Sequence, residues 1–196
     1  MNGRTIHLLR HGPPRRAGLL LGHRDEPAAD PAGGLGGAVP AGLAMSCIVS
    51  SDLQRARTGA QTLAQQRGLA LTIDSRWREL DFGDWDGLAP ENLPAEALSR
   101  FWNDPEACPP PRGERWSALC ARVAAALCDL PDDALVVTHG GAMRAAVAAV
   151  TGLDFRQVWA FDLPYAALLG LRIWPAAEAG APPSGQIVRL HSGAMR

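Results

Sequence analysis

Short apolar runs that alternate with amphipathic segments constrain the fold of this chain more than any other feature of its 196 residues. Runs such as 5–10 and 134–138 are five or six residues long and stop abruptly at His-Gly, which favours buried strands over helices. The longer segments place apolar side chains at the spacing of one helix face. Strands that alternate with helices build a parallel sheet with helices on its faces. We therefore predict an α/β fold, a three-layer sandwich with a mostly parallel central sheet of about six strands.

The expected elements follow one another along nearly the whole chain. Ser51 or Asp52 is expected to cap a helix that runs to about Arg67, with Gly68 as its C-cap. Three consecutive prolines predict an extended segment over 105–113. The predicted strands are 5–10, 47–50, 69–73, 134–138, 166–174 and 186–191, and the predicted helices are a weak one at 35–45 and others at about 52–67, 93–102, 114–130 and 140–151.

The composition is that of a globular chain with a single core. It is 47% hydrophobic and 20% charged, which is typical of an ordinary soluble protein. The length favours one domain, and no internal repeat or linker interrupts it. We expect residues 1–196 to form a single domain.

All 19 basic residues are Arg, and the chain contains no Lys. P-loop nucleotidases and protein kinases need a Lys on the phosphates, and Schiff-base enzymes need a Lys amine. These classes are therefore excluded. Arg remains, and its planar fork suits bidentate recognition of phosphate or carboxylate groups.

The net charge and the absence of targeting signals limit which partners and locations we expect. A net charge of -1 argues against nucleic-acid binding. The N-terminal apolar stretch is too short for a signal peptide, and the uncharged run 31–51 holds too many Gly and Pro residues for a membrane helix. We expect a cytoplasmic protein without a membrane partner. The oligomeric state is not specified by the sequence, and a homodimer is compatible with it. The four Cys form no CxxC pair and no ligand cluster, so neither a metal nor a cofactor is expected.

Two predicted strands end in a His followed by Gly. Arg10 and His11 end the first strand, and His139 follows the strand 134–138. Ligands of open α/β sheets bind outside the carboxyl ends of the strands. Either His alone would more often be structural. Two of them, with Gly beside each and an Arg that would be costly to bury unpaired, favour a shared anion site.

Further candidate residues are expected near this shared anion site. The helix that starts near Gly140 would aim its N–H groups at an anion. Arg55 lies in the first turn of a helix, where a cation opposes the helix dipole, so we expect it to serve an anion. For Arg57 a solvated surface position is equally plausible. The acidic loop 76–90 carries Glu79, Asp81, Asp84 and Asp86, of which one could donate a proton to a leaving oxygen while at least two are expected to be solvated.

Four segments together resemble the signatures of the histidine phosphatase superfamily, the phosphoglycerate-mutase-like family. They are Leu-Leu-Arg-His-Gly at 8–12, Ser-Asp-Leu-Gln-Arg-Ala at 51–56, Arg-Glu-Leu-Asp-Phe-Gly-Asp-Trp-Asp-Gly at 78–87 and Thr-His-Gly-Gly at 138–141. Arg-His-Gly alone would be weak evidence for the family, but all four segments occur in order. The similarity runs from about residue 4 to residue 174. The resemblance implies a phosphoglycerate-mutase-like fold. It further implies a phosphohistidine formed on His11, phosphoryl binding by Arg10, Arg55 and His139, and Glu79 as general acid and then base.

Within the family, the chain looks most like the short phosphatase branch that includes alpha-ribazole phosphatase. The segment Gly22-His23-Arg24-Asp25 resembles that branch and makes His23 a candidate for substrate binding, together with Gly140. The expected activity is metal-independent hydrolysis of a small phosphate monoester, with alpha-ribazole 5'-phosphate as one candidate. A phosphoglycerate-type mutase and a non-catalytic phospho-ligand binding protein are the alternatives. Departures from the family pattern at 13–14, 86 and 115 leave the substrate open.

Overall fold

The computed structural model describes residues 3–35, 37–175 and 183–192. Six strands form one sheet in the order β3-β2-β4-β1-β5-β6. Both the α/β class and the number of strands agree with the sequence-based prediction. The strands are β1 (Arg4–Arg10), β2 (Cys47–Ser50), β3 (Leu71–Ile73), β4 (Ala134–Thr138), β5 (Leu168–Trp174) and β6 (Ser184–His191).

The sheet is mixed, with a parallel part that carries the strand ends of interest. β1 pairs with β4, β4 with β2 and β2 with β3, all in parallel. β5 runs antiparallel to β1, and β6 antiparallel to β5. In the β1–β4 register, Arg10 lies opposite Thr138. The residues that follow these two strands, His11 and His139, therefore leave the sheet at the same edge.

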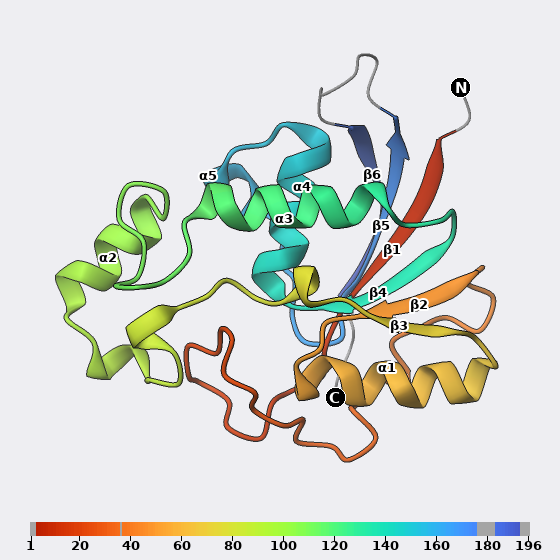
Figure 1. The fold of residues 1–196 in the computed structure, drawn as a ribbon, viewed down its shortest axis with the longest axis horizontal. Helices are drawn as coiled ribbons and strands as arrows, with labels where there is room; N and C mark the ends of the chain where they lie inside the picture. Colours follow the sequence, from red (N-terminus) through yellow and green to blue (C-terminus); the bar gives the residue numbers. More distant parts are fainter. Residues whose placement is uncertain (1–2, 36, 176–182, 193–196) are drawn as a thin grey trace.

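Helices cover both faces of the sheet, as Figure 1 shows for α1 on one side and α3 and α4 on the other. Alternate side chains of a strand point to opposite faces. In β1, Leu8 packs in the core with α3 and α4, whereas Leu9 packs in a second core with α1. The helices are α1 (Gln54–Arg67), α2 (Ala95–Asn103), α3 (Trp116–Cys128), α4 (Gly140–Thr151) and α5 (Phe155–Val158).

Several local expectations need correction. The weak helix at 35–45 is wrong: the described residues of this segment, 35 and 37–45, form turns and irregular chain, because Gly and Pro disfavour a helix that no packing rescues. The segment 105–113 is folded into turns and is not fully extended. The N-cap of α1 is Leu53 and makes no side-chain cap bond, while Gly68 closes the helix at φ 63° as predicted.

The short helix α5 has no counterpart among the predicted elements. It begins at Asp154, whose side chain accepts the N–H of Gln157 while the Gln157 side chain accepts the N–H of Asp154. Among the described residues, no helix is long and apolar enough to cross a membrane.

Candidate active site

The ends of β1 and β4 bring two histidines together. The backbone N–H of His11 donates to the carbonyl of Thr138 at 2.9 Å, which extends the ladder between the two strands by one residue. The imidazole rings of His11 and His139 meet edge to face with 4.9 Å between their centroids. Both side chains are buried, at 5% and 0% exposure. The two strand ends thus form one side of a single site.

His11 presents a defined tautomer. Its Nδ1 lies 2.5 Å from the carbonyl oxygen of Gly12. A carbonyl can only accept, so Nδ1 carries the proton and Nε2 of the neutral ring keeps its lone pair. Burial, followed by the charges of Arg55 and Arg10, holds the pKa of His11 well below its ordinary value. A buried, neutral imidazole with a free Nε2 is the state that a nucleophile requires.

Two guanidinium groups accompany this ring. Arg55, 1% exposed in the first turn of α1, donates to the carbonyls of Leu21 at 3.1 Å, Gly22 at 2.6 Å and Arg24 at 2.8 Å. These bonds anchor the loop after β1 and fix the guanidinium beside His11.

Arg10 is held by a different part of the chain, residues 163–165. It donates to the carbonyl of Leu163 at 2.5 Å and lies over the ring of Tyr165, 4.4 Å from its centroid. Its Nε has no hydrogen-bond partner among the described residues. A buried donor without a partner is ready to bind a ligand.

Glu79 is held against the start of α4. Its Oε2 accepts the N–H of Gly141 at 3.0 Å, and its Oε1 accepts the N–H of Leu80 at 2.8 Å. A Cβ atom at position 141 would overlap Oε1 of Glu79, so glycine is the residue that leaves the carboxylate in this place. The carboxylate therefore sits at a helix N-terminus with both of its oxygens oriented by backbone donors.

His139 and His23 occupy supporting places and are not among the residues that line the cavity. His139 Nε2 shares a hydrogen bond with Ser51 Oγ at 2.9 Å, while its Nδ1 has no partner among the described residues. Burial, followed by the charge of Arg55, sets the pKa of His139 well below its ordinary value. His23 Nε2 donates to the carbonyl of Glu79 at 3.1 Å and its Nδ1 lies 3.7 Å from a carboxylate oxygen of Asp81, so both contacts are with the acidic loop.

Two arginines of the site escaped the sequence analysis. Arg122 on α3 donates to the carbonyl of Glu79 at 2.7 Å and pairs with Glu114 at 2.8 Å, which ties the acidic loop to α3. Arg144 on α4 lines the cavity at 8% exposure. Neither residue belongs to one of the four signature segments, so the sequence did not single it out.

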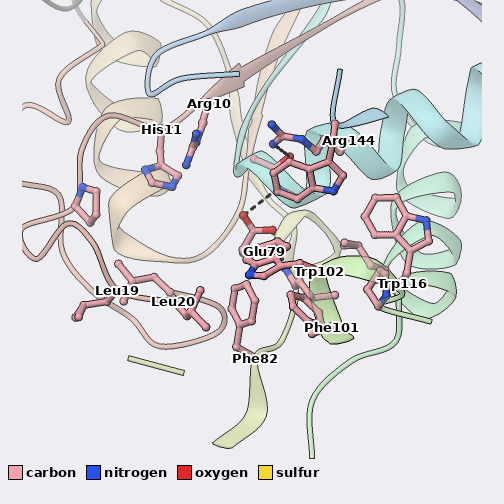
Figure 2. Close-up of a pocket in the computed structure, with 18 of the residues that line it drawn as sticks. Arg10, His11, Leu19, Leu20, Glu79, Phe82, Phe101, Trp102, Trp116 and Arg144 are labelled. Atoms are coloured by element: carbon pink, nitrogen blue, oxygen red, sulfur yellow. Dashed lines mark hydrogen bonds between the residues drawn. The ribbon is translucent and has the colours of Figure 1, made fainter. Parts of the chain in front are cut away.

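A cavity of about 240 Å³ joins these groups to an aromatic wall (Figure 2). Five of the seven predicted site residues line it, at one end: Arg10, His11, Arg55, Glu79 and Gly140. The rest of the lining is mostly apolar and includes Leu19, Leu20, Leu21, Leu80, Phe82, Phe101, Trp102, Trp116, Leu119, Phe155, Trp159 and Tyr165.

A family model described as the histidine phosphatase superfamily (branch 1) matches residues 6–179. The chain belongs to this superfamily. The matched range contains all four signature segments and the ends of both strands, β1 and β4.

Relatives of this chain carry several names. The chain is 28% identical to the adenosylcobalamin/alpha-ribazole phosphatase of Escherichia coli, over 80% of this chain and 83% of that protein. It is 34% identical to the glucosyl-3-phosphoglycerate phosphatase of Mycobacterium tuberculosis, over 54% of each chain. The match thus spans about half the length of the mycobacterial protein.

Solved structures show the same fold. The mycobacterial glucosyl-3-phosphoglycerate phosphatase in complex with inorganic phosphate superposes with a TM-score of 0.70 at 27% identity, over 94% of this chain and 95% of that one. A putative alpha-ribazole-5'-P phosphatase from Escherichia coli superposes with a TM-score of 0.76 at 24% identity, over 95% of this chain and 96% of that one.

Proposed function

We propose that this histidine phosphatase hydrolyses phosphate monoesters through a phosphohistidine formed on Nε2 of His11. One observation carries the proposal: a neutral imidazole, whose Nδ1–H is hydrogen-bonded to a carbonyl, lies beside the guanidinium groups of Arg10 and Arg55 in a cavity that all three residues line. Phosphoryl transfer needs positioning and stabilisation of the equatorial oxygens more than covalent chemistry. The proposed activity needs no metal and no cofactor.

In the first step, Nε2 of His11 attacks phosphorus and the ester P–O bond breaks as the P–N bond forms. Arg10 and Arg55 bind the phosphoryl oxygens and neutralise their charge, with His139 behind the His11 ring as a further candidate donor. The leaving oxygen takes a proton from the carboxyl group of Glu79. The positive charge of the phosphorylated imidazole is shared with the Nδ1–H that donates to the carbonyl of Gly12.

In the second step, water attacks phosphorus and the P–N bond breaks. The carboxylate of Glu79, left by the first proton transfer, accepts the proton of the water. His11 returns to its neutral form and inorganic phosphate is released. Glu79 suits both roles because backbone N–H groups, and not a fixed cation, orient its oxygens.

The substrate is a small phosphorylated metabolite. The relatives' names make alpha-ribazole 5'-phosphate and glucosyl-3-phosphoglycerate the first compounds to test. The apolar wall supports a leaving group with an apolar face. A cytoplasmic location and the absence of a nucleic-acid partner stay predictions from the sequence.

The test is turnover of p-nitrophenyl phosphate and of these two compounds in excess EDTA. We expect hydrolysis that EDTA does not lower, which His11→Ala abolishes and His191→Ala, a change at an exposed histidine, leaves intact. A requirement for a bisphosphate primer would favour the mutase. Tight phosphate binding without turnover would favour the non-catalytic alternative.

A further inference from the structure

Arg144 is a buried cation that the proposed chemistry does not use. It lies one helical turn after Gly140 on α4 and faces the cavity at 8% exposure. Its Nε has no hydrogen-bond partner among the described residues. A buried charge with an unused donor is costly unless a ligand completes its bonding.

The protein holds the Arg144 guanidinium in place but does not use all of its hydrogen-bond donors. Its terminal nitrogens donate to the carbonyls of Gly140 at 3.3 Å and Phe161 at 3.2 Å, and its plane covers the ring of Trp159 at 4.0 Å from the centroid. A guanidinium has five N–H donors, so these two bonds leave others unused. No acidic side chain forms an ion pair with Arg144 among the described residues. Burial lowers its pKa, and Glu79 is the strongest opposing charge.

Arg144 lies beside Arg10 and extends from there to the aromatic wall. A Cβ atom at Gly140 would lie 3.2 Å from Nη1 of Arg144 and 3.3 Å from Cζ of Arg10, and the Arg144 guanidinium stacks on Trp159. In the view of Figure 2, Arg144 lies between Arg10 and Trp116. A phosphoryl group on His11 would put its ester oxygen toward Glu79, so the leaving group would extend along this wall.

The side chains packed around Trp159 are aromatic. Trp159 packs against Trp102 and Phe155 with centroids 5.3 and 5.9 Å apart, and Trp116 packs against Phe155 at 5.3 Å. Apolar surroundings strengthen a charge-assisted hydrogen bond that a ligand brings. The unused donors of Arg144 therefore suit an acceptor that the substrate carries.

We propose that Arg144 determines specificity by binding a second oxyanion, of the carboxylate type, carried by the leaving group. The inference rests on the proposed phosphatase function and names its substrate class: monoesters whose leaving group joins an apolar body to an oxyanion. A substrate without that group, such as alpha-ribazole 5'-phosphate, would leave the guanidinium unpaired.

The experiment compares two aryl phosphates of nearly equal size, carboxyphenyl phosphate and carbamoylphenyl phosphate, each as ortho, meta and para isomers and each measured on variant and wild-type protein. We expect Arg144→Met to lower kcat/KM for the preferred carboxyphenyl isomer by about 10- to 100-fold, mainly through KM, because a charge-assisted bond is lost. The loss for the matching carbamoyl compound should stay within about 3-fold. Arg156→Met, which removes an exposed arginine of α5, should change neither.

Equal losses on both compounds for every isomer, or no loss on any, would overturn the inference. The proposed function fails separately, if the wild-type protein hydrolyses neither compound. If Arg144→Met does not fold, the inference is tested by inhibition of the wild-type protein with two phosphonates. The carboxybenzyl phosphonate should bind at least about 10-fold more tightly than the carbamoylbenzyl phosphonate, and equal inhibition would contradict the inference.

Discussion

At the scale of single residues, Glu79 is the group whose role can be separated most cleanly from that of its neighbours. Its two oxygens face backbone donors in the cavity, whereas Asp84 pairs with Arg112 outside the cavity lining. We expect Glu79→Gln to slow hydrolysis of an alkyl phosphate by about 100- to 10,000-fold, the usual effect of losing a general acid. The loss should be smaller for p-nitrophenyl phosphate, whose leaving group needs little protonation.

Asp84→Asn is the matched control and should keep most of the activity on both substrates. The measurement is the rate on the alkyl and on the aryl phosphate for four proteins, the wild type and the Glu79→Gln, Asp81→Asn and Asp84→Asn variants. An equal slowing of both substrates by Glu79→Gln, or the same leaving-group dependence in Asp81→Asn, would mean that the proton donor is assigned to the wrong residue.

At the scale of elements, the start of α4 orders the carboxylate through Gly141. A methyl group at this position would displace Glu79 Oε1, although alanine is otherwise a better helix former than glycine. We expect Gly141→Ala to lower kcat by at least about 100-fold while Tm changes by only a few degrees. Gly42→Ala adds its methyl group in open space and serves as the control. Near-normal kcat in Gly141→Ala would show that the contact between Gly141 and Glu79 is dispensable.

Sequence reasoning reached the elements whose signals are local. β1 and β4 are short apolar runs that end at His-Gly, so their strand character and the approach of His11 to His139 could be predicted. The cap of α1 could not be predicted, because Ser51 Oγ is shared between the N–H of Leu53 and the ring of His139, which follows β4 far along the chain.

Contacts between separate elements explain why other site residues were not predicted correctly. Arg122 and Arg144 join the site from α3 and α4 through partners that no periodicity reveals. His23 has a suggestive sequence context, but its ring contacts the backbone of Glu79 and does not line the cavity.

At the scale of the whole molecule, buried neutral histidines link stability to pH. Burial is the main cause that lowers the pKa of His7, His11 and His139 in the folded state. Between these lowered values and the ordinary value of about 6.5, the unfolded chain binds more protons than the folded one. The free energy of unfolding should therefore fall as pH drops below about 6.5, by up to ~1.4 kcal/mol per pH unit for each such histidine.

Urea unfolding at pH 7 and pH 5 measures this dependence. His11→Asn should flatten it by about one proton, because the titrating group is gone, while His191→Asn at an exposed site should leave it unchanged. The same slope in His11→Asn as in the wild-type protein would mean that His11 does not titrate differently in the two states.

The proposed mechanism requires a covalent bond between phosphorus and Nε2 of His11. The most direct measurement is a rapid alkaline quench during turnover of a ³²P-labelled monoester, followed by peptide mapping of the protein-bound label. The mechanism predicts label that is stable in alkali, lost in acid and confined to the peptide that contains His11, with none in His11→Ala and more in Glu79→Gln when a good leaving group is used. Turnover at the wild-type rate in His11→Ala, or label on another residue, would contradict it.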